Sequence, residues 1–492
     1  LFLKLSGFIR ESIIARQFGA TDLTDGYLYA FSLVTLIVAM ISGGFNNVFL
    51  PMYMKKKKEN PEEAERNANG IMNATVIGFL ILSILTFFLI PSIIPFITPD
   101  NLAPEAETVA VKTMQLFCVA MAAIALNGIL ESYLQGRRIF VLAQISKIFA
   151  TLMGAVFAIF FSDTWGIYSL AYGFVFGTVL GIFIQFFYLN KNGFHWSPTV
   201  KVESEFRNSF LVLIVPALLN SVVGQVNMFV NKTFALGTVG GGATYLNNAS
   251  LIVSIPNIIY ATTIAAIIFT LLSEQVDNKK KFQDTMHMGM QISLVTLLPM
   301  AVGFYLVGEE AIAFIYEGGA FTPEDTHNTY IALVLYLPMI VAQGLQYIVS
   351  KSMYALGKTA IIFRISATTI ILNLVINWLI VDSLGYPGLA VTSSIVAIYY
   401  LVVSSMALYR EVDRSEAKRL FNMIIRVIPA TVLMATPIYL LKHFTLLGNM
   451  PDIVQLVLFG GLGVVIYAIG LYVFYKEAFV RLLSFVKRKK KA

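Results

Sequence analysis

The sequence predicts an all-α polytopic membrane protein with about fourteen transmembrane helices. Its 492 residues are 57% hydrophobic and only 13% charged, and the mean hydropathy is +0.76. A soluble chain of ordinary composition carries about 25% charged residues. The apolar residues fall in long segments, and a helix needs roughly 20 of them to cross the hydrocarbon core. The basic residues gather in every second loop, which is typical of a chain threaded back and forth through a membrane.

We expect each long apolar segment to form one transmembrane helix. The segments lie approximately at 1–19, 25–50, 70–97, 106–134, 139–161, 165–189, 208–236, 244–272, 284–307, 328–355, 360–381, 386–409, 421–441 and 453–475. Because the sequence opens at Leu1, inside the first segment, we expect a few residues to precede it.

The distribution of charge predicts the topology. Most of the 35 lysines and arginines lie in alternate loops, as in "KKKK" (Lys55 to Lys58), "RR" (Arg137 and Arg138), "KKK" (Lys279 to Lys281) and the tail "KRKKK". The loops between them, such as "ATDLTD" and "YEGGAFTPEDTHN", contain none. The positive-inside rule then places both termini and the basic loops in the cytoplasm. The net charge of +7 is thus explained by topology and lipid-surface contacts rather than by nucleic-acid binding.

Three short stretches recur at nearly constant distance. "YLYAFSL" at Tyr27 resembles "YLNNASL" at Tyr245, "YLQG" at Tyr133 resembles "YALG" at Tyr354, and "GIYSLA" resembles "GYPGLA". We therefore predict two pseudo-symmetric six-helix lobes, which form parallel repeats about the membrane normal. The predicted parts are an N-terminal lobe at 1–190, a cytoplasmic linker at 191–207, a C-terminal lobe at 208–412, two further helices within 413–476 and a basic cytoplasmic tail at 477–492.

The sequence contains no motif that indicates an enzyme. No "GxxxxGK[ST]" phosphate-binding loop is present, so the chain is not expected to hydrolyse ATP. The four histidines show no metal-ligand spacing, and the single Cys118 lies in an apolar run where a buried structural role is expected. We expect no cofactor and no metal, and a transport activity driven by the membrane potential, an ion gradient or substrate flux.

One motif carries a family resemblance. "IYEGGAFTPEDT" (Ile315 to Thr326) resembles the "ERGAFT..D" motif of the MurJ/MviN lipid II flippases, within the multidrug/oligosaccharidyl-lipid/polysaccharide (MOP) exporter superfamily. "GFIRESIIARQFGATDLTDGYLYAF" is similar to the family's first helix and loop, and "LNLVINWLIVDSLGYPGLAVTSSIVA" to its later helices. The resemblance runs in order along essentially the whole chain.

The resemblance implies an alternating-access flippase of the bacterial cytoplasmic membrane, acting in peptidoglycan and cell wall biogenesis and cell shape. Its cargo would be lipid II, the undecaprenyl-pyrophosphate-linked peptidoglycan precursor, moved from the inner to the outer leaflet. The family's functional positions fall on Arg10, Arg16, Asp25 and Lys232. Membrane lipids and the cell-wall synthesis machinery would be partners of a monomer.

This chain departs from the family pattern at several charged positions. The family's basic pair in the second helix falls on Ile37 and Val38, its glutamate there on Ser42, and an arginine of the eighth helix on Leu251. Gly318 replaces the arginine of "ERG". Flippases for other polyprenyl-linked polysaccharide repeat units, and cation-coupled drug exporters, therefore stay open as alternatives. A membrane glycosyltransferase would need longer outer loops with acidic catalytic residues.

The charges of the first helix have their own physical interpretation. Arg10 lies about 13 Å from the helix end at Gly19, near the middle of the membrane. A charge there costs about 2.5–3.5 kcal/mol on insertion scales, and Arg10 cannot snorkel to water as Arg16 can. Two arginines in one helix indicate an anion site, because guanidinium binds phosphate oxygens in bidentate fashion. The alternative for these arginines is an internal ion pair with Glu11 or Asp25. The alternative for Lys232 is that its side chain snorkels to the outer membrane surface.

Overall fold

The computed structural model describes residues 2–98, 102–413, 415–444, 447 and 450–481. Nearly all of them are helical, and apart from one isolated bridge between Gly318 and Phe321 none is in a β-strand. The predicted all-α class is confirmed. Most of the predicted basic tail, from residue 482 onward, lies outside the described residues.

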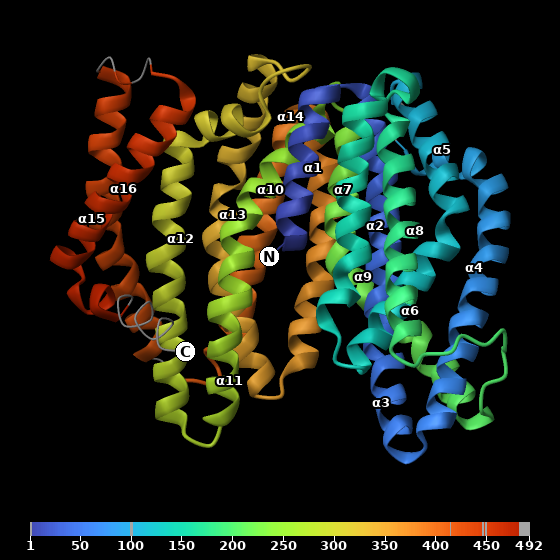
Figure 1. Cartoon of the computed structure of the whole chain (residues 1–492). Coiled ribbons are helices and arrows are strands. Elements are labelled where there is room, and N and C mark those ends of the chain that lie inside the picture. The colour runs from blue at the N-terminus through green and yellow to red at the C-terminus, as the bar shows by residue number, and fades with distance from the viewer. Residues whose placement is uncertain (1, 99–101, 414, 445–446, 448–449, 482–492) are drawn as a thin grey trace. The chain divides into compact units, whose positions relative to one another are not determined.

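The described residues form two compact units (Figure 1). The first unit comprises Leu1–Thr244 and Gly318–Phe321, and the second comprises Tyr245–Glu317 and Thr322–Ala492. The helices of the first unit are α1 (Phe2–Phe18), α2 (Asp22–Asn47), α3 (Phe49–Glu59), α4 (Pro61–Ile97), α5 (Pro104–Val119), α6 (Met121–Gly136), α7 (Phe140–Trp165), α8 (Tyr168–Lys191) and α9 (Ser204–Leu236).

The second unit begins within the first turn of α10. Its helices are α10 (Gly242–Tyr260), the π-helical turn η1 (Ala261–Ala265), α11 (Ala266–Glu274), α12 (Lys279–Tyr316), α13 (Pro323–Ala355), α14 (Thr359–Leu408), α15 (Ser415–Phe444) and α16 (Asp452–Phe474). These units group residues by packing, and they place α9 with the first unit. The lobe boundaries expected from the sequence stay a prediction.

Every predicted apolar segment corresponds to a helix or to a broken pair of helices. Among the described residues ten helices are long and apolar enough to cross a membrane, or eleven when α5 and α6, which meet at a bend of 56°, are taken as one span. Two predicted segments share α14, which is 50 residues long and leaves helical geometry at Gly385. The chain is thus a multi-pass membrane protein, and the number fourteen stays a prediction.

The proposed sequence repeat has a counterpart in backbone conformation. Gly166 follows α7 with φ 54° and ψ −142°, and Gly385 interrupts α14 with φ 61° and ψ −150°. Glycine lacks a Cβ and adopts this region readily, whereas other residues rarely do. The two glycines belong to the paired stretches "GIYSLA" and "GYPGLA", so both copies turn the chain between helices in the same way.

Some charges outside the family positions pair locally. The Lys147 ammonium lies 2.6 Å from a carboxylate oxygen of the buried Glu131, and the Gln144 amide donates to the same carboxylate. The Lys351 ammonium lies 4.7 Å from the ring centre of Phe269, in a cation–π contact. These side chains are therefore accounted for within the fold.

Candidate functional site

Arg10 is the most enclosed cation of α1. It is 9% exposed, and its guanidinium forms an ion pair with Glu11, which is also buried. The guanidinium carbon lies 4.2 Å from the ring centre of Phe31 on α2. On the α7 side, Gly154 lies beside the arginine stem, since a Cβ at Gly154 would be 4.0 Å from Cδ of Arg10. Arg10 is thus held between α2 and α7.

The partners of Arg10 do not use all of its hydrogen-bonding capacity. Guanidinium carries five N–H donors in a planar fork. The buried Nε of Arg10 has no hydrogen-bond partner among the described residues. A buried donor left unpaired costs about 1–3 kcal/mol, and more when the group is charged. Arg10 therefore keeps an unused donor at a buried position.

Lys232 adds a second buried cation to the same unit. It lies on α9, is 8% exposed, and α9 packs along α2 through contacts such as the stacked rings of Tyr29 and Phe229. Among the described residues no carboxylate oxygen lies within 4.0 Å of its ammonium. The charged groups whose fields act on it are Glu11, Arg10 and Asp25. Lys232 and Arg10 therefore belong to one electrostatic cluster.

Asp25 has a structural partner of its own. Its carboxylate accepts hydrogen bonds from the backbone N–H groups of Ala243 (3.1 Å) and Thr244 (2.8 Å), and from the Thr244 hydroxyl (2.6 Å). Both residues lie in the first turn of α10, where unpaired N–H groups and the helix dipole favour an anion. Three donors thus bind the carboxyl group of Asp25, which is 2% exposed.

Arg16 differs from the other cations because its side chain is exposed. Its backbone is fixed by the motif turn Gly318–Phe321: the N–H of Ala320 donates to the carbonyl oxygen of Arg16 at 2.8 Å. A Cβ at Gly319, where φ is +61°, would lie only 2.1 Å from that oxygen. The glycine-rich motif therefore packs against the end of α1 and sets the position from which Arg16 projects.

The structure accordingly separates the predicted site residues into three environments. Arg10 and Lys232 are buried and act on each other, Asp25 is bound by the start of α10, and Arg16 is exposed. Sequence reasoning did not identify Phe31, Gly154 or Thr244 as contributors. Phe31 and Gly154 are an ordinary aromatic and an ordinary glycine in apolar runs, so no sequence signal marks them.

The positions where the family carries other charges are filled without charge in this chain. Ile37 and Val38 are partly buried and pack against apolar clusters of the first unit, and Ser42 is 7% exposed. Gly318 has φ +119°, a conformation that side-chain-bearing residues rarely adopt. An arginine in its place would be strained in this turn. Within the described residues, no group of three or more His, Cys, Asp or Glu residues could hold a metal ion.

The second unit contains an apolar groove of about 440 Å³ between α12, α15 and α16. Its walls include Pro299, Ile438, Phe459 and Tyr467, and the glycines at 303, 460 and 463 keep the space open. Its lining is almost entirely hydrocarbon, so it suits an apolar ligand.

Comparisons with known proteins agree across the chain. The family described as "Lipid II flippase MurJ" matches residues 14–458. A probable lipid II flippase MurJ of Buchnera aphidicola subsp. Acyrthosiphon pisum (strain APS) is 25% identical over 463 residues, covering 92% of this chain and 89% of that protein. The corresponding protein of Rickettsia prowazekii (strain Madrid E) is 24% identical over 453 residues, which cover 90% and 88%.

Solved structures show the same fold. A lipid II flippase MurJ in an inward closed conformation superposes with a TM-score of 0.81 at 22% identity, over 97% of both chains. An inward-facing multidrug resistance MATE family transporter of the MOP superfamily gives a TM-score of 0.68 at 14% identity, over 86% of this chain and 94% of that one.

Proposed function

We propose that this chain, which belongs to the MurJ family of lipid II flippases, moves lipid II from the inner to the outer leaflet of the bacterial cytoplasmic membrane. The chain is a transporter and not an enzyme. The observation that carries the choice of cargo is a pair of buried cations in the first unit, one of which has no carboxylate within ion-pair distance among the described residues. Arg10 and Lys232 are both buried within the helix bundle, and the only carboxylate paired with either is that of Glu11 among the described residues.

The chemistry of the cargo matches this cluster. A pyrophosphate linker is a compact dianion with many acceptor oxygens, and guanidinium is the side chain best suited to bind it. Arg10 would offer its unused Nε donor, while Lys232 would supply charge from α9. The exposed Arg16 would meet the linker first, with its backbone held by the motif turn. Asp25 would act by holding the start of α10 rather than by touching the cargo.

The polyprenyl chain of the cargo needs an apolar surface. The groove between α12, α15 and α16 has the size and the hydrocarbon lining for a segment of such a chain. We therefore propose that the groove binds the lipid tail. Arg10 and Lys232, which we call the cationic cluster, would bind the pyrophosphate.

The energy source and surroundings follow from the same proposal. We infer transport by alternating access of two lobes, coupled to the membrane potential or an ion gradient, since one charge crossing 100 mV releases about 2.3 kcal/mol. We place both termini in the cytoplasm on the basis of the basic loops. The protein would work as a monomer among membrane lipids, alongside the enzymes that make and polymerise the precursor.

A second candidate is a flippase for another polyprenyl-linked polysaccharide repeat unit. It is favoured by the uncharged residues at Ile37, Val38, Ser42 and Leu251, where the family resemblance places charges. Such a cargo shares the pyrophosphate and the polyprenyl chain and differs in its glycan. A cation-coupled drug exporter would call for unpaired acids in its binding cavity, whereas Lys232 is a buried base with no carboxylate within ion-pair distance among the described residues.

Depletion of the protein in its own cell distinguishes these candidates. If the chain carries lipid II, depletion should stop wall synthesis and cause lipid II to accumulate in the inner leaflet. Accumulation of a different polyprenyl-linked glycan, with normal lipid II turnover, would overturn the first proposal in favour of the second. Normal levels of all lipid-linked intermediates would overturn both.

A further inference from the structure

The segment between α8 and α9 is bound along α4 by three asparagines. Asn67 accepts from the backbone N–H of Glu203 at 2.9 Å, and Asn69 accepts from that of Ser197 at 3.1 Å. The Asn73 amide donates to the backbone carbonyls of Ser197 and Thr199, both at 2.7 Å. An amide side chain both donates and accepts, so it can pair with irregular backbone as another strand would. We call residues 192–203 the strap.

Trp196 is oriented by the same interaction. Its indole Nε1 donates to the Asn73 side-chain oxygen at 3.0 Å, while 56% of the residue is exposed. A tryptophan whose N–H is hydrogen-bonded and whose ring is exposed is typical of the boundary between lipid headgroups and acyl chains. The strap therefore presents an aromatic ring at a fixed angle.

A cavity of about 580 Å³ lies between the strap and the helices of the first unit. Apart from Asn73 its walls are apolar, with Val76 of α4, Leu126 of α6 and Phe186 of α8 facing Trp196 and Val200 of the strap. This volume is within the range of about 300–1,000 Å³ found for small-ligand sites. On the same helix as Phe186, Phe183 and Phe187 are each about 70% exposed, as expected of side chains that face lipid.

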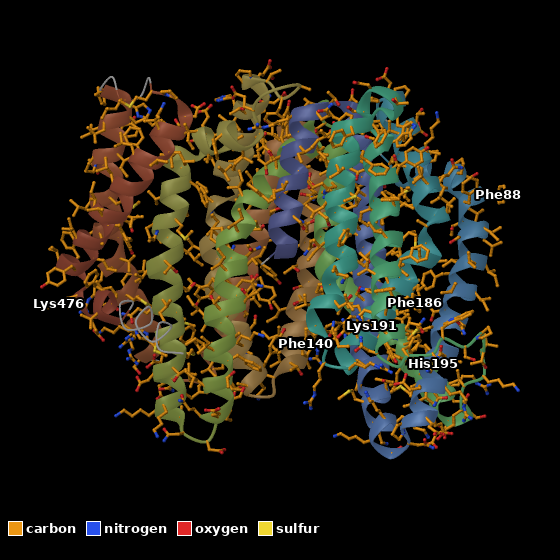
Figure 2. The ribbon with its side chains drawn as sticks, in the orientation of Figure 1. Phe88, Phe140, Phe186, Lys191, His195 and Lys476 are labelled. Atoms are coloured by element: carbon orange, nitrogen blue, oxygen red, sulfur yellow. The ribbon has the colours of Figure 1, made fainter. Side chains whose placement is uncertain are left out.

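Two lysines flank, in the sequence, the strap residues that line this cavity. The exposed Lys191 and Lys201 stand at the two ends of residues 191–201, which also contain His195 and no acidic residue. Figure 2 shows Phe186, Lys191 and His195 in the same part of the first unit. The neighbouring Lys56, in contrast, is 2.6 Å from Glu203 and is thereby neutralised. An apolar cavity, an interfacial tryptophan and two lysines that form no ion pair within the described part of the chain together suit an amphiphile with an anionic head.

We propose that this cavity binds one acyl chain of an anionic glycerophospholipid, whose phosphate is met by Lys191 and Lys201. The site is distinct from the cationic cluster of α1 and α9, and none of its residues takes part in the proposed cargo site. Basic residues beside pockets between transmembrane helices are a recognised arrangement for anionic headgroups. Occupancy would fasten the strap to α4, α6 and α8.

Tryptophan quenching by brominated lipids tests the proposal directly. The chain has three tryptophans, Trp165, Trp196 and Trp378. A variant that retains only Trp196 (W165F with W378F) is reconstituted with phosphatidylcholine containing a small fraction of brominated phosphatidylglycerol or brominated phosphatidylcholine. A variant that retains only Trp378, which is 70% exposed on α14, reports ordinary lipid contact.

We expect brominated phosphatidylglycerol to quench Trp196 more strongly than brominated phosphatidylcholine, and to quench Trp378 no differently from it. In the Trp196-only variant, Lys191→Gln with Lys201→Gln should reduce the preference by about fivefold for each lysine removed. Lys280→Gln with Lys281→Gln, which changes charge equally on another basic loop, should leave it unchanged.

Filling the cavity tests the acyl-chain half of the proposal. Val76→Phe in the Trp196-only variant should occupy the cavity and abolish the preference of Trp196 for the brominated anionic lipid. Ala74→Phe is the matched control, since its side chain is exposed on the same helix and does not line the cavity, and it should leave the preference unchanged.

Equal quenching of Trp196 by both lipids would overturn the proposal and would mean ordinary lipid contact only. A preference that survives both the lysine substitutions and Val76→Phe would overturn it as well. Thermal unfolding and size-exclusion profiles of each variant identify any that has lost its fold, and the Lys191 and Lys201 variants lie at exposed positions where folding should be preserved.

Discussion

Two charged clusters, one in each unit, handle buried charge in opposite ways. In the second unit, the Lys442 ammonium lies 2.6 Å from a carboxylate oxygen of Glu310 and donates to the Leu306 carbonyl at 2.8 Å. That carbonyl stands beside Val307, where α12 leaves helical geometry with φ −128°. Lys442 is thus paired with one acid, Glu310, and it also binds a backbone carbonyl next to the kink in α12. In the first unit, Arg10 is paired with Glu11, while Lys232 has no carboxylate within ion-pair distance among the described residues.

The two clusters show how a charge that stabilises the fold differs from one that is available to a ligand. A balanced pair such as Lys442 with Glu310 joins α15 to α12, and its removal should be felt in stability. A buried cation without a direct ion-pair partner, such as Lys232 among the described residues, gains nothing from such a pair, and burying it is unfavourable. Its presence is explained if an anionic ligand supplies the missing charge during transport. Substitutions in both clusters test this distinction, and Arg10 should give the strongest loss of transport.

Arg10→Ala should abolish transport and also lower the amount of folded protein. The substitution leaves the Glu11 carboxylate buried without the arginine charge beside it, and breaking a buried ion pair in this way costs roughly 3–5 kcal/mol. Complementation of a depletion strain, compared at matched membrane levels, measures the first effect and thermal unfolding the second. Arg10→Lys should retain part of the activity, since an ammonium supplies charge without the planar fork.

The double variant Arg10→Gln with Glu11→Gln separates the two roles of Arg10. It removes both charges together, so folding should recover while transport stays lost. If this variant supports normal growth, Arg10 serves only the internal pair, and the anion site in α1 is wrong.

Lys232→Met and Lys442→Met are matched substitutions with opposite expected results. Lys232→Met should reduce transport strongly and leave the melting temperature unchanged or raised, because a buried charge without a partner is removed. Lys442→Met should lower the melting temperature, since Glu310 would be left buried alone, and keep transport at equal protein levels. The same response from both variants would erase the proposed distinction between the two clusters.

Gly460→Leu and Gly461→Leu test whether the second unit contributes apolar surface to the cargo. A Cβ at either glycine would have no atom within 4 Å, so both substitutions fit sterically at the first carbon. Only Gly460 lines the groove between α12, α15 and α16. We expect Gly460→Leu to impair transport moderately and to weaken binding of the long-chain cargo more than that of a short-chain analogue. Equal activity of the two variants would remove the groove from the transport path.

The smallest expected effect concerns the exposed end of the strap. Hydrogen bonding to Lys56 lowers the pKa of the Glu203 carboxyl. A carboxyl whose folded pKa is depressed stabilises the fold above its ordinary value of about 4.5 and loses that contribution as pH falls below it. The protection of residues 197–203 against hydrogen exchange, taken relative to the intrinsic exchange rate at each pH, should therefore fall slightly below about pH 4.5. Glu203→Gln should show the lowered protection already at neutral pH. If protection depends neither on pH nor on Glu203→Gln, the asparagines of α4 alone hold the strap in place.

Two kinds of sequence information determined the fold. Hydropathy located the helices because a membrane helix must be apolar along its length, and this is a local property of consecutive residues. The motif "YEGGAFTPED" and its flanking stretches identified the family, and the mid-membrane position of Arg10 marked it as a functional candidate. The sequence also named Glu11 as an alternative partner for Arg10, and the structure contains that ion pair.

Contacts between residues far apart in the chain were decided only by the tertiary structure. Asp25 binds Thr244, which is 219 residues away, and Asn73 binds backbone 124 and 126 residues away, because hydrogen bonds depend on proximity that helix packing creates. The stacking of Arg10 on Phe31 and the burial of Lys232 without a direct ion pair among the described residues depend likewise on how α1, α2 and α9 pack. Composition and spacing specify which side chains exist and along which helices they lie. Whether a charged side chain has an ion-pair partner depends on which residues helix packing places beside it. Only the folded chain determines this.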